Sequence, residues 1–456
     1  MFVERVLMRC DVLVAGGGPG GWAAAVEAAR HGADVILVDR NGYLGGNMAT
    51  GLPLLAYLDK NGRQVTKGIA EEFISRLDSV GGTFGHARCP MHNSVTVVNP
   101  EIVKLITYEM ANEAGVRILL HCELCGVDSE DGHINSVTFA GKGMLFEISA
   151  SVYIDGTGDG DVAYAAGASC EKGMEGTGVM QPPTVLFTIG GVNKERFYDY
   201  LDAHPEMLTQ PESMQVGAGY NTALFRKFKS HVILGMKPFL DELRNRGECP
   251  VDRDTLIFIN SMNEDQLVVN STRILSFDGS DPRELTRGEF KGLEQVSPLI
   301  KVLNKYIPGF EKAYISSISP NIGVRETRRV IGFKTLKIDS VLAGAVPDDT
   351  IALGSYKVDI HSGTGAGTRL EVLDMPYGIP YSCLVSSEFD NLMMSGRCIS
   401  MDSASLGTVR VMPTCMAIGH AAGIAAALAA KESIKAADIN VCTIRSILID
   451  ENAVLS

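Results

Sequence analysis

The run Asp11-Val-Leu-Val-Ala-Gly-Gly-Gly-Pro-Gly-Gly21, followed by Val35-Ile-Leu-Val-Asp39, decides the fold. This pattern predicts a strand in the first apolar run, a turn at the glycines, a helix in the small-residue segment and a strand in the second apolar run. The glycines match G-x-G-x-x-G, and the carboxylate lies about twenty residues further on, where a ribose hydroxyl needs an acceptor. The stretch therefore predicts a dinucleotide site, with an ordinary tight turn as the alternative. Expected contacts to the nucleotide are Gly16, Gly18, Pro19, Gly20, Gly21, Asp39 and Arg40.

Composition bounds the class of protein. The 456 residues are 45% hydrophobic and 21% charged, as in a globular chain with a large core. A net charge of −13 argues against nucleic acid and anionic membrane surfaces as partners. No run approaches the roughly 18–20 apolar residues of a spanning helix, and the first ten residues lack a signal-peptide pattern. Ten scattered cysteines favour reduced thiols in a cytoplasmic protein. The sequence leaves a homo-oligomer open.

The order of elements predicts an α/β fold. Residues 1–174 and 321–456 are expected to form one discontinuous Rossmann-like domain, three-layered and similar to that of glutathione reductase, with helices at 66–77 and 100–113. Residues 175–320 differ in character, with a turn-rich start, amphipathic segments at 222–247 and 283–305, and strands near 255–260 and 266–270. We interpret this segment as an inserted α+β substrate or cap domain.

Three further features favour FAD over NAD. A glycine pair follows the first βαβ unit at Leu44-Gly-Gly-Asn47, and Asp155-Gly-Thr-Gly-Asp159 closes a later strand. Gly396-Arg397 and an Ala/Gly-rich helix from Pro413 form another strand–loop–helix, whose positive amino end suits the negative N1–C2=O edge of a reduced flavin. Plain core packing is the alternative for that helix. The expected cofactor is non-covalent FAD, with contacts from Gly45, Gly46, Asn47, Gly158, Asp159, Gly396, Arg397, Val411 and Met412.

The chain resembles the FAD-dependent oxidoreductases akin to the flavoprotein component of heterodisulfide reductase. More distantly it resembles the flavoproteins of fumarate reductase and succinate dehydrogenase. Beside the glycine motif, the resemblance rests on Ile154-Asp-Gly-Thr-Gly-Asp-Gly-Asp161, Val324-Arg-Glu-Thr-Arg-Arg-Val-Ile-Gly332 and Gly407-Thr-Val-Arg-Val-Met-Pro413. It implies hydride exchange at the flavin N5.

The resemblance draws attention to Arg325, His361 and Arg410 as candidate catalytic residues, and Tyr381 is a fourth candidate. Arg410 stands where fumarate-reductase-like enzymes carry a substrate-binding arginine. Arg325 can bind a carboxylate bidentately, or form an ion pair with Glu326. His361, two residues after Asp359, is the general acid/base candidate, although the two side chains can equally form a structural polar pair. Tyr381 can donate to a substrate oxygen, with aromatic packing as the default.

No metal site is predicted. His86, Cys89 and His92 lack an evident fourth ligand for zinc, and we interpret their segment as a polar loop. Cys122-Glu-Leu-Cys125 is a solitary C-x-x-C, whereas an iron–sulfur cluster needs four thiolates. A cluster is therefore not expected, although relatives of heterodisulfide reductase carry them. Binding of NAD(P) stays open.

The sequence thus favours an FAD-dependent oxidoreductase that exchanges a hydride with a small polar substrate bearing a carboxylate or hydroxyl group. Arg325 and Arg410 would bind this substrate, and His361 would move the proton. The alternative is a flavin-bearing electron-transfer component of a larger redox complex, with a protein as its partner. An NAD(P) dehydrogenase is the third hypothesis.

Overall fold

The computed structural model describes residues 4–456, and its main sheet contains the predicted βαβ unit. The order is β6-β2-β1-β9-β8-β7. β21 lies off this path and pairs with the carboxyl end of β9. β6, β2, β1, β9 and β21 run parallel, and β7, β8 and β9 form an antiparallel meander. This confirms the predicted α/β class. The strands are β1 (Glu4–Ala15), β2 (Val35–Asp39), β6 (Arg117–Leu120), β7 (Glu123–Glu130), β8 (His133–Gly141), β9 (Met144–Asp155) and β21 (Leu392–Met394).

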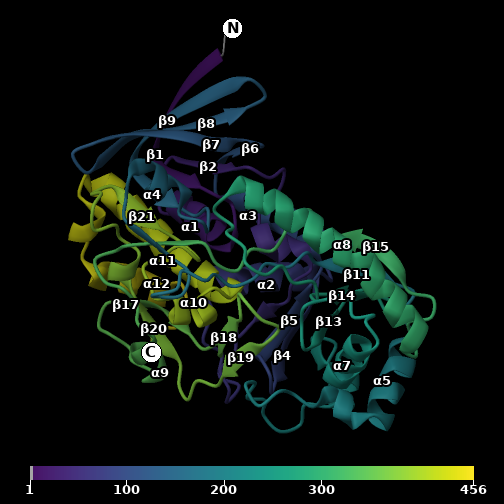
Figure 1. The fold of residues 1–456 in the computed structure, drawn as a ribbon. Helices are drawn as coiled ribbons and strands as arrows, with labels where there is room; N and C mark the ends of the chain where they lie inside the picture. The colour runs from purple at the N-terminus through teal and green to yellow at the C-terminus, as the bar shows by residue number, and fades with distance from the viewer. Residues whose placement is uncertain (1–3) are drawn as a thin grey trace.

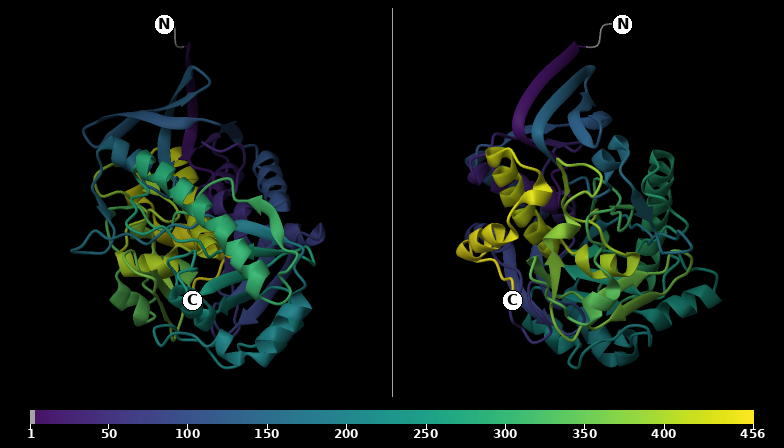
Figure 2. Two further views of the ribbon diagram at one scale, coloured as in Figure 1. Left: turned by 45° about the vertical axis from the view of Figure 1, so that its right-hand side comes forward. Right: turned by 90° about the vertical axis from the view of Figure 1, so that its left-hand side faces the viewer.

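One strand is longer than expected. The sequence pattern predicts separate strands at 143–149 and 151–154, but β9 is continuous and pairs with β1 from Glu4↔Met144 to Ala15↔Asp155. No glycine or proline interrupts residues 144–155, so nothing ends the ladder midway. The outer halves of β1 and β9 project from the body beside β8 (Figures 1 and 2).

Helices α1 (Pro19–Arg30), α3 (Pro100–Glu113) and α11 (Met412–Glu432) pack together beside this sheet. α1 and α11 lie side by side although they come from opposite ends of the chain (Figure 1). Close approach requires small residues, because a Cβ on Gly423 would stand only 2.9 Å from the amide nitrogen of Ala28. α2 (Ile69–Ser79) begins three residues later than predicted.

By length and composition alone, α11 could cross a membrane. In the protein, 83% of its apolar window is buried, and it packs against α1, β1 and β9. This is the environment of a core helix rather than of a lipid-facing one.

A second, antiparallel sheet has the order β12-β13-β14-β11-β15. The predicted amphipathic segment 222–247 is not one helix, because a strand with both faces buried interrupts it. Val232 and Ile233 are β-branched and face opposite sides of the sheet, so period-2 burial overrides the helical pattern here. The elements are β11 (Phe187–Gly190), β12 (Val232–Gly235), β13 (Leu256–Asn260), β14 (Leu267–Val269), β15 (Tyr314–Ile318), α5 (Lys194–Ala203), α6 (Thr222–Lys227), α7 (Lys237–Asn245) and α8 (Pro282–Tyr306).

Smaller elements join the two sheets. The expected polar loop at 86–92 is largely a β-hairpin, because β4 and β5 pair from His86↔Thr96 to Cys89↔Asn93. The strand expected at 327–338 is confined to β16, after which the chain turns irregularly. The remaining elements are β3 (Leu54–Leu55), β4 (Thr83–Cys89), β5 (Asn93–Val98), β10 (Cys170–Lys172), β16 (Arg328–Val330), β17 (Thr350–Gly354), β18 (Val358–His361), β19 (Thr368–Glu371), β20 (Tyr377–Pro380), α4 (Asp161–Ala166), α9 (Ile338–Leu342), α10 (Ser403–Val409) and α12 (Val441–Asp450).

Candidate active site

A long groove runs across the carboxyl ends of β1, β2 and β9, beside the start of α1. Gly16 has φ +94°, and a Cβ there would come within 2.7 Å of the Thr157 Cα. Gly18 differs, because its missing Cβ would meet nothing within 4 Å and would project into open space. The backbone is therefore bare where α1 presents its amino end, which fits a bound pyrophosphate.

Asp39 lies at the end of β2 and is 7% exposed. Its Oδ2 accepts from the Gly17 amide at 2.6 Å, and its Oδ1 accepts from the Asn41 amide at 2.7 Å. Burial raises the pKa of Asp39, although these amides oppose the rise. A carboxylate fixed in this way at the groove wall has lone pairs left for ribose hydroxyls.

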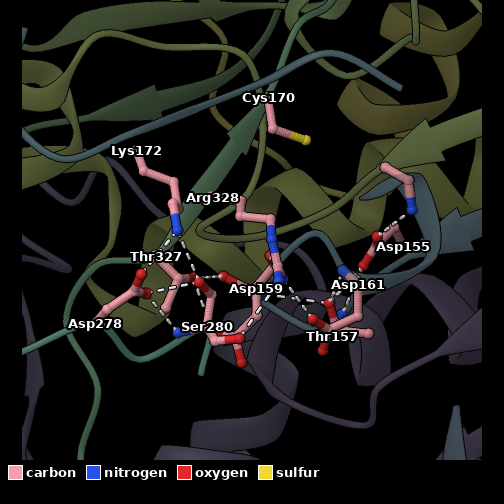
Figure 3. Close-up of polar contacts among 12 residues, drawn as sticks. Asp155, Thr157, Asp159, Asp161, Cys170, Lys172, Asp278, Ser280, Thr327 and Arg328 are labelled. Atoms are coloured by element: carbon pink, nitrogen blue, oxygen red, sulfur yellow. Dashed lines mark hydrogen bonds and ion pairs between the residues drawn. The ribbon is translucent and has the colours of Figure 1, made fainter. Parts of the chain in front are cut away.

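The turn after β9 also lines the groove. Figure 3 shows the polar contacts of this turn at Asp155, Thr157 and Asp159. Asp159 Oδ1 accepts from Thr327 Oγ1 at 2.7 Å and from Arg397 Nη2 at 3.0 Å. Arg397 Nη1 is buried and has no hydrogen-bond partner among residues 4–456. A buried, unsatisfied guanidinium N–H beside the groove fits an oxyanion or carbonyl of a bound cofactor.

Most of the predicted cofactor residues line this groove. They are Gly16, Gly18, Pro19, Gly20, Asp39, Arg40, Gly46, Asn47, Gly158, Asp159, Gly396, Arg397 and Met412. Gly21 instead packs α1 on β1, because a Cβ there would overlap the Gly16 carbonyl oxygen. Gly45 shapes the adjoining turn, where its amide donates to the Gly17 carbonyl at 2.8 Å. Val411 lines a second cavity.

This second cavity, which we call the chamber, adjoins the groove. Its volume is about 1110 Å³ including the mouth. The two spaces share walls formed by Asn47, Val324, Arg397, Arg410 and Met412. A molecule in the chamber would therefore meet a cofactor in the groove at these residues.

Arg410 stands at this junction, after the last turn of α10 and two residues before α11. Its Nη2 donates to the Asp359 carbonyl at 3.1 Å and lies 3.3 Å from Asp359 Oδ2. Its Nε is buried without a partner among the described residues. No side chain within residues 4–456 caps the amino end of α11, so its free amides reinforce the positive potential of Arg410.

His361 ends β18, lines the chamber and is 7% exposed. Its Nε2 lies 3.3 Å from Asp359 Oδ1, and its Nδ1 lies 3.0 Å from Thr368 Oγ1. Burial lowers the pKa of His361 to about 3. The charge of Asp359 opposes this shift, and the charge of Arg325 adds to it. The imidazole is therefore neutral near pH 7, with both nitrogens engaged. Burial alone would raise the pKa of Asp359, but His361, Arg410 and Arg325 hold it well below its usual range.

Arg325 also lines the chamber and does not pair with Glu326. Its Nη1 donates to the Pro182 carbonyl at 2.6 Å and to Thr184 Oγ1 at 2.8 Å. Glu326 binds Arg329 instead, at 2.7 Å. Burial lowers the pKa of Arg325 well below its usual value, and the charges of Arg410 and Arg253 lower it further.

Tyr381 is not among the residues that line the groove or the chamber, which favours the packing alternative. Its buried hydroxyl donates to the Ala436 carbonyl at 2.7 Å, so the residue packs as an ordinary core tyrosine. The three suggested zinc ligands do not converge either. Cys89 Sγ lies 3.6 Å from His92 Nδ1, while the ring nitrogens of His86 contact Thr96 and Glu71.

Several chamber residues had no signal in the sequence. Arg253 precedes β13 and Asn270 follows β14. Thr184 precedes β11, and Tyr356 precedes β18. None of them belongs to a motif, and only the tertiary fold brings them together.

Comparison with known proteins identifies the class. Residues 11–448 match the model of a family described as FAD dependent oxidoreductase, so the chain belongs to that family. FAD is the cofactor of this family, and the protein is an oxidoreductase.

Two curated relatives come from methanogenic archaea. Digeranylgeranylglycerophospholipid reductase 2 of Methanosphaera stadtmanae is 29% identical over 205 residues, or 42% of this chain and 50% of the relative. Digeranylgeranylglycerophospholipid reductase 1 of Methanothermobacter thermautotrophicus is 31% identical over 190 residues, which are 37% of this chain and 45% of the relative. The matches thus span about half the length of these relatives.

Solved structures show the same fold. A geranylgeranyl bacteriochlorophyll reductase-like protein from Thermoplasma acidophilum superposes with a TM-score of 0.52 at 13% identity, over 98% of this chain and 85% of that one. The p-nitrophenol 4-monooxygenase of Pseudomonas putida gives 0.50 at 11% identity, over 99% and 88%. The narrower resemblance to the flavoprotein of heterodisulfide reductase stays a prediction.

Proposed function

We propose that this protein transfers a hydride between the N5 of FAD and a small polar organic substrate held in the chamber. The observation that carries the proposal is the wall shared by chamber and groove, where Arg410 and Met412 border both spaces. When bound, FAD would supply a two-electron redox centre at this wall. The curated relatives are named as reductases of an organic molecule, which favours an enzyme over an electron carrier.

The side chains would divide the work. Arg410 and Arg325 would bind an oxygen-rich, anionic group of the substrate, since each presents N–H groups toward the chamber. His361, neutral and fixed by Asp359 and Thr368, would accept or return a proton once substrate displaces the Thr368 hydroxyl. The uncapped start of α11 would stabilise negative charge at the junction.

Anaerobic reduction of the purified holoprotein tests this function. We expect a member of a panel of hydroxy acids, unsaturated acids, sugars and pyridine nucleotides to exchange electrons with the flavin, monitored as bleaching or return of the yellow band. Arg410→Ala should slow the exchange by about 10–100-fold with FAD content unchanged, because a charged hydrogen bond is lost. The exchange rate of Arg410→Lys should lie between those of the native protein and Arg410→Ala.

Normal turnover by Arg410→Ala would remove Arg410 from the site. A flavin that only a protein donor reduces would instead support the second candidate, an electron-transfer component resembling that of heterodisulfide reductase. Bleaching by NADH or NADPH would establish a nicotinamide as a redox partner.

Other features of the protein remain proposals. We retain residues 1–174 and 321–456 as the FAD domain and 175–320 as the substrate domain. We also retain a cytoplasmic location without nucleic-acid or membrane partners. Sedimentation analysis of the holoprotein would test for a homo-oligomer.

A further inference from the structure

The chamber contains more positive charge than its own carboxylate can balance. Four arginines line it, whereas Asp359 is the one acidic residue in the lining within residues 4–456. Asp359 is already engaged by Arg410 and His361. Arg397 pairs with Asp159 in the groove. This leaves Arg325 and Arg253 without a carboxylate partner in the described part of the chain.

Arg253 is 2% exposed, and its guanidinium donates to a neutral group. Its Nη1 donates to the Asn270 carbonyl at 2.9 Å, while its Nε is buried without a partner among the residues described. Arg325 Nη2 lies 3.4 Å from the side-chain oxygen of the same Asn270. A buried guanidinium group and a partly buried one around a single asparagine are costly unless an anion joins them.

Much of the remaining chamber lining is an apolar wall that adjoins this polar group, because the Asn270 amide donates to the Ile257 carbonyl at 3.0 Å. Alternate residues of β12 and β13 form this wall, namely Val232, Leu234, Ile257 and Ile259, while Ile233 and Phe258 pack into a separate core on the other face of the sheet. Loop and strand residues complete this wall: Leu52, Pro53, Leu55, Leu186, Met214 and Leu370. From Glu4 to Ser456, no cationic side chain belongs to this wall.

We propose that the substrate is an amphipathic acid, with one carboxylate held by Arg253, Arg325 and Asn270 and an apolar body along β12 and β13. This inference rests on the proposed function and adds the chemical class of its substrate. The second charge of a dicarboxylate would either compete with Asp359 for Arg410 or lie against aliphatic side chains, and a neutral molecule would leave both guanidinium groups without a counter-charge. Aromatic acids and medium-chain unsaturated acids fit both walls.

Titration of the holoprotein tests the class without requiring turnover. The probes are octanoate, cinnamate, acetate, succinate and 1-octanol, and the readout is the shift of the visible flavin band on binding. Octanoate and cinnamate should bind at least about tenfold more tightly than the other three, since only they satisfy both the charge and the apolar wall. Equal affinity for octanol and octanoate, or tighter binding of succinate, would overturn the inference.

Variants assign the two halves of the site. Arg253→Leu should weaken octanoate binding about tenfold or more and leave octanol unchanged, while Arg253→Lys should recover part of the loss. Leu234→Ala should weaken the binding of octanoate and leave the binding of acetate unchanged. The control is Arg246→Leu, which removes an exposed arginine at the end of α7 and should change nothing.

The outcome separates this inference from the proposed function. If octanoate shifts the flavin band but no organic acid exchanges electrons, the binding class stands and the hydride-transfer function fails. If a substrate without an apolar body reduces the flavin, the function stands and the amphipathic class is wrong.

Discussion

Gly18 and Gly21 belong to one motif but meet different surroundings. Gly18 has φ −69° and ψ −177°, which any residue adopts, and faces the open groove. We therefore expect Gly18→Val to fold normally but to lack FAD, because the valine methyl groups fill the phosphate position. Absorbance of the purified protein and circular dichroism measure the two effects. Gly21→Val, which collides with the Gly16 carbonyl, should instead impair folding. A yellow Gly18→Val protein would contradict the assignment.

His361 carries a prediction about pH. Burial lowers its pKa to about 3, so the imidazole stays neutral throughout the physiological range. The rate constant for flavin reduction, measured by stopped flow, should therefore show no inflection near pH 6.5 that depends on His361. His361→Gln should lower this rate at every pH without altering the shape of the profile. An inflection near 6.5 that disappears in His361→Gln would show that the residue titrates in the working range.

At the scale of elements, sequence-based predictions are accurate where a local signal specifies the boundary. α3 spans the predicted residues, because Pro100 occupies its first position and Asn99 caps it by accepting from the amides of Glu101 and Ile102. The amphipathic pattern of 222–247 did not reveal β12, which pairs with β13 outside this segment. A periodicity within one segment cannot report such a partner.

The contact of α11 with α1 gives a stability prediction. Gly423→Val should lower the free energy of unfolding by about 1–3 kcal/mol, because the new side chain pushes against the α1 backbone at Ala24 and Ala28. Thermal denaturation measures the loss. Lys431→Val introduces the same residue at an exposed position of the same helix and should cost much less. Equal losses of stability in the two variants would show that the low helix propensity of valine, not packing against α1, causes the effect.

α12 is held in place by Glu451, which His31 of α1 and His420 of α11 both contact, the former at 2.9 Å. Burial would raise the pKa of Glu451, but the two histidines lower it to about 2. The hydrogen bond to Glu451 raises the pKa of His31 above 6.5. The carboxylate contribution is complete above about pH 4.5 and declines in acid. The His31 contribution is complete below pH 6.5 and declines in base.

Glu451→Gln should therefore lower the melting temperature most between about pH 4.5 and 6.5, and less at about pH 9. Differential scanning calorimetry across this range measures the difference from the native chain. Glu432→Gln, at the exposed end of α11, provides the control. A loss that does not vary with pH would indicate that the contact acts through packing alone.

At the scale of the molecule, the groove is assembled from distant segments of the chain, among them 16–20, 39–47, 122–124, 156–161, 321–324 and 395–415. FAD should therefore stabilise the whole fold, by about 2.7 kcal/mol when free FAD is about a hundredfold above its Kd. Thermal unfolding of the apoprotein with increasing FAD should show a rising midpoint. Gly18→Val, which has the same fold and no phosphate position, should show no shift.

The site could be predicted only in part, because its two halves depend on contacts of different range. The groove follows from local motifs, since glycine turns and Asp39 stand in fixed relation to the strands that carry them. The roles of Arg325 and Arg410 were predicted from the resemblance to a known family, and both residues line the chamber. Arg253 and Asn270 line that chamber from the segments just before β13 and just after β14, so no spacing along the chain relates them to the rest. The sequence could not show that the Ala436 carbonyl accepts the Tyr381 hydroxyl, which favours the packing alternative for this residue.

The pairing of α1 with α11 also has a consequence for biogenesis. The ribosome makes α1 among the first segments and α11 among the last, and residues of the final quarter complete the groove. A nascent or truncated polypeptide therefore has nowhere to lodge the flavin and leaves apolar helical surface uncovered. Stable binding of FAD would then have to wait until α11 has been synthesised.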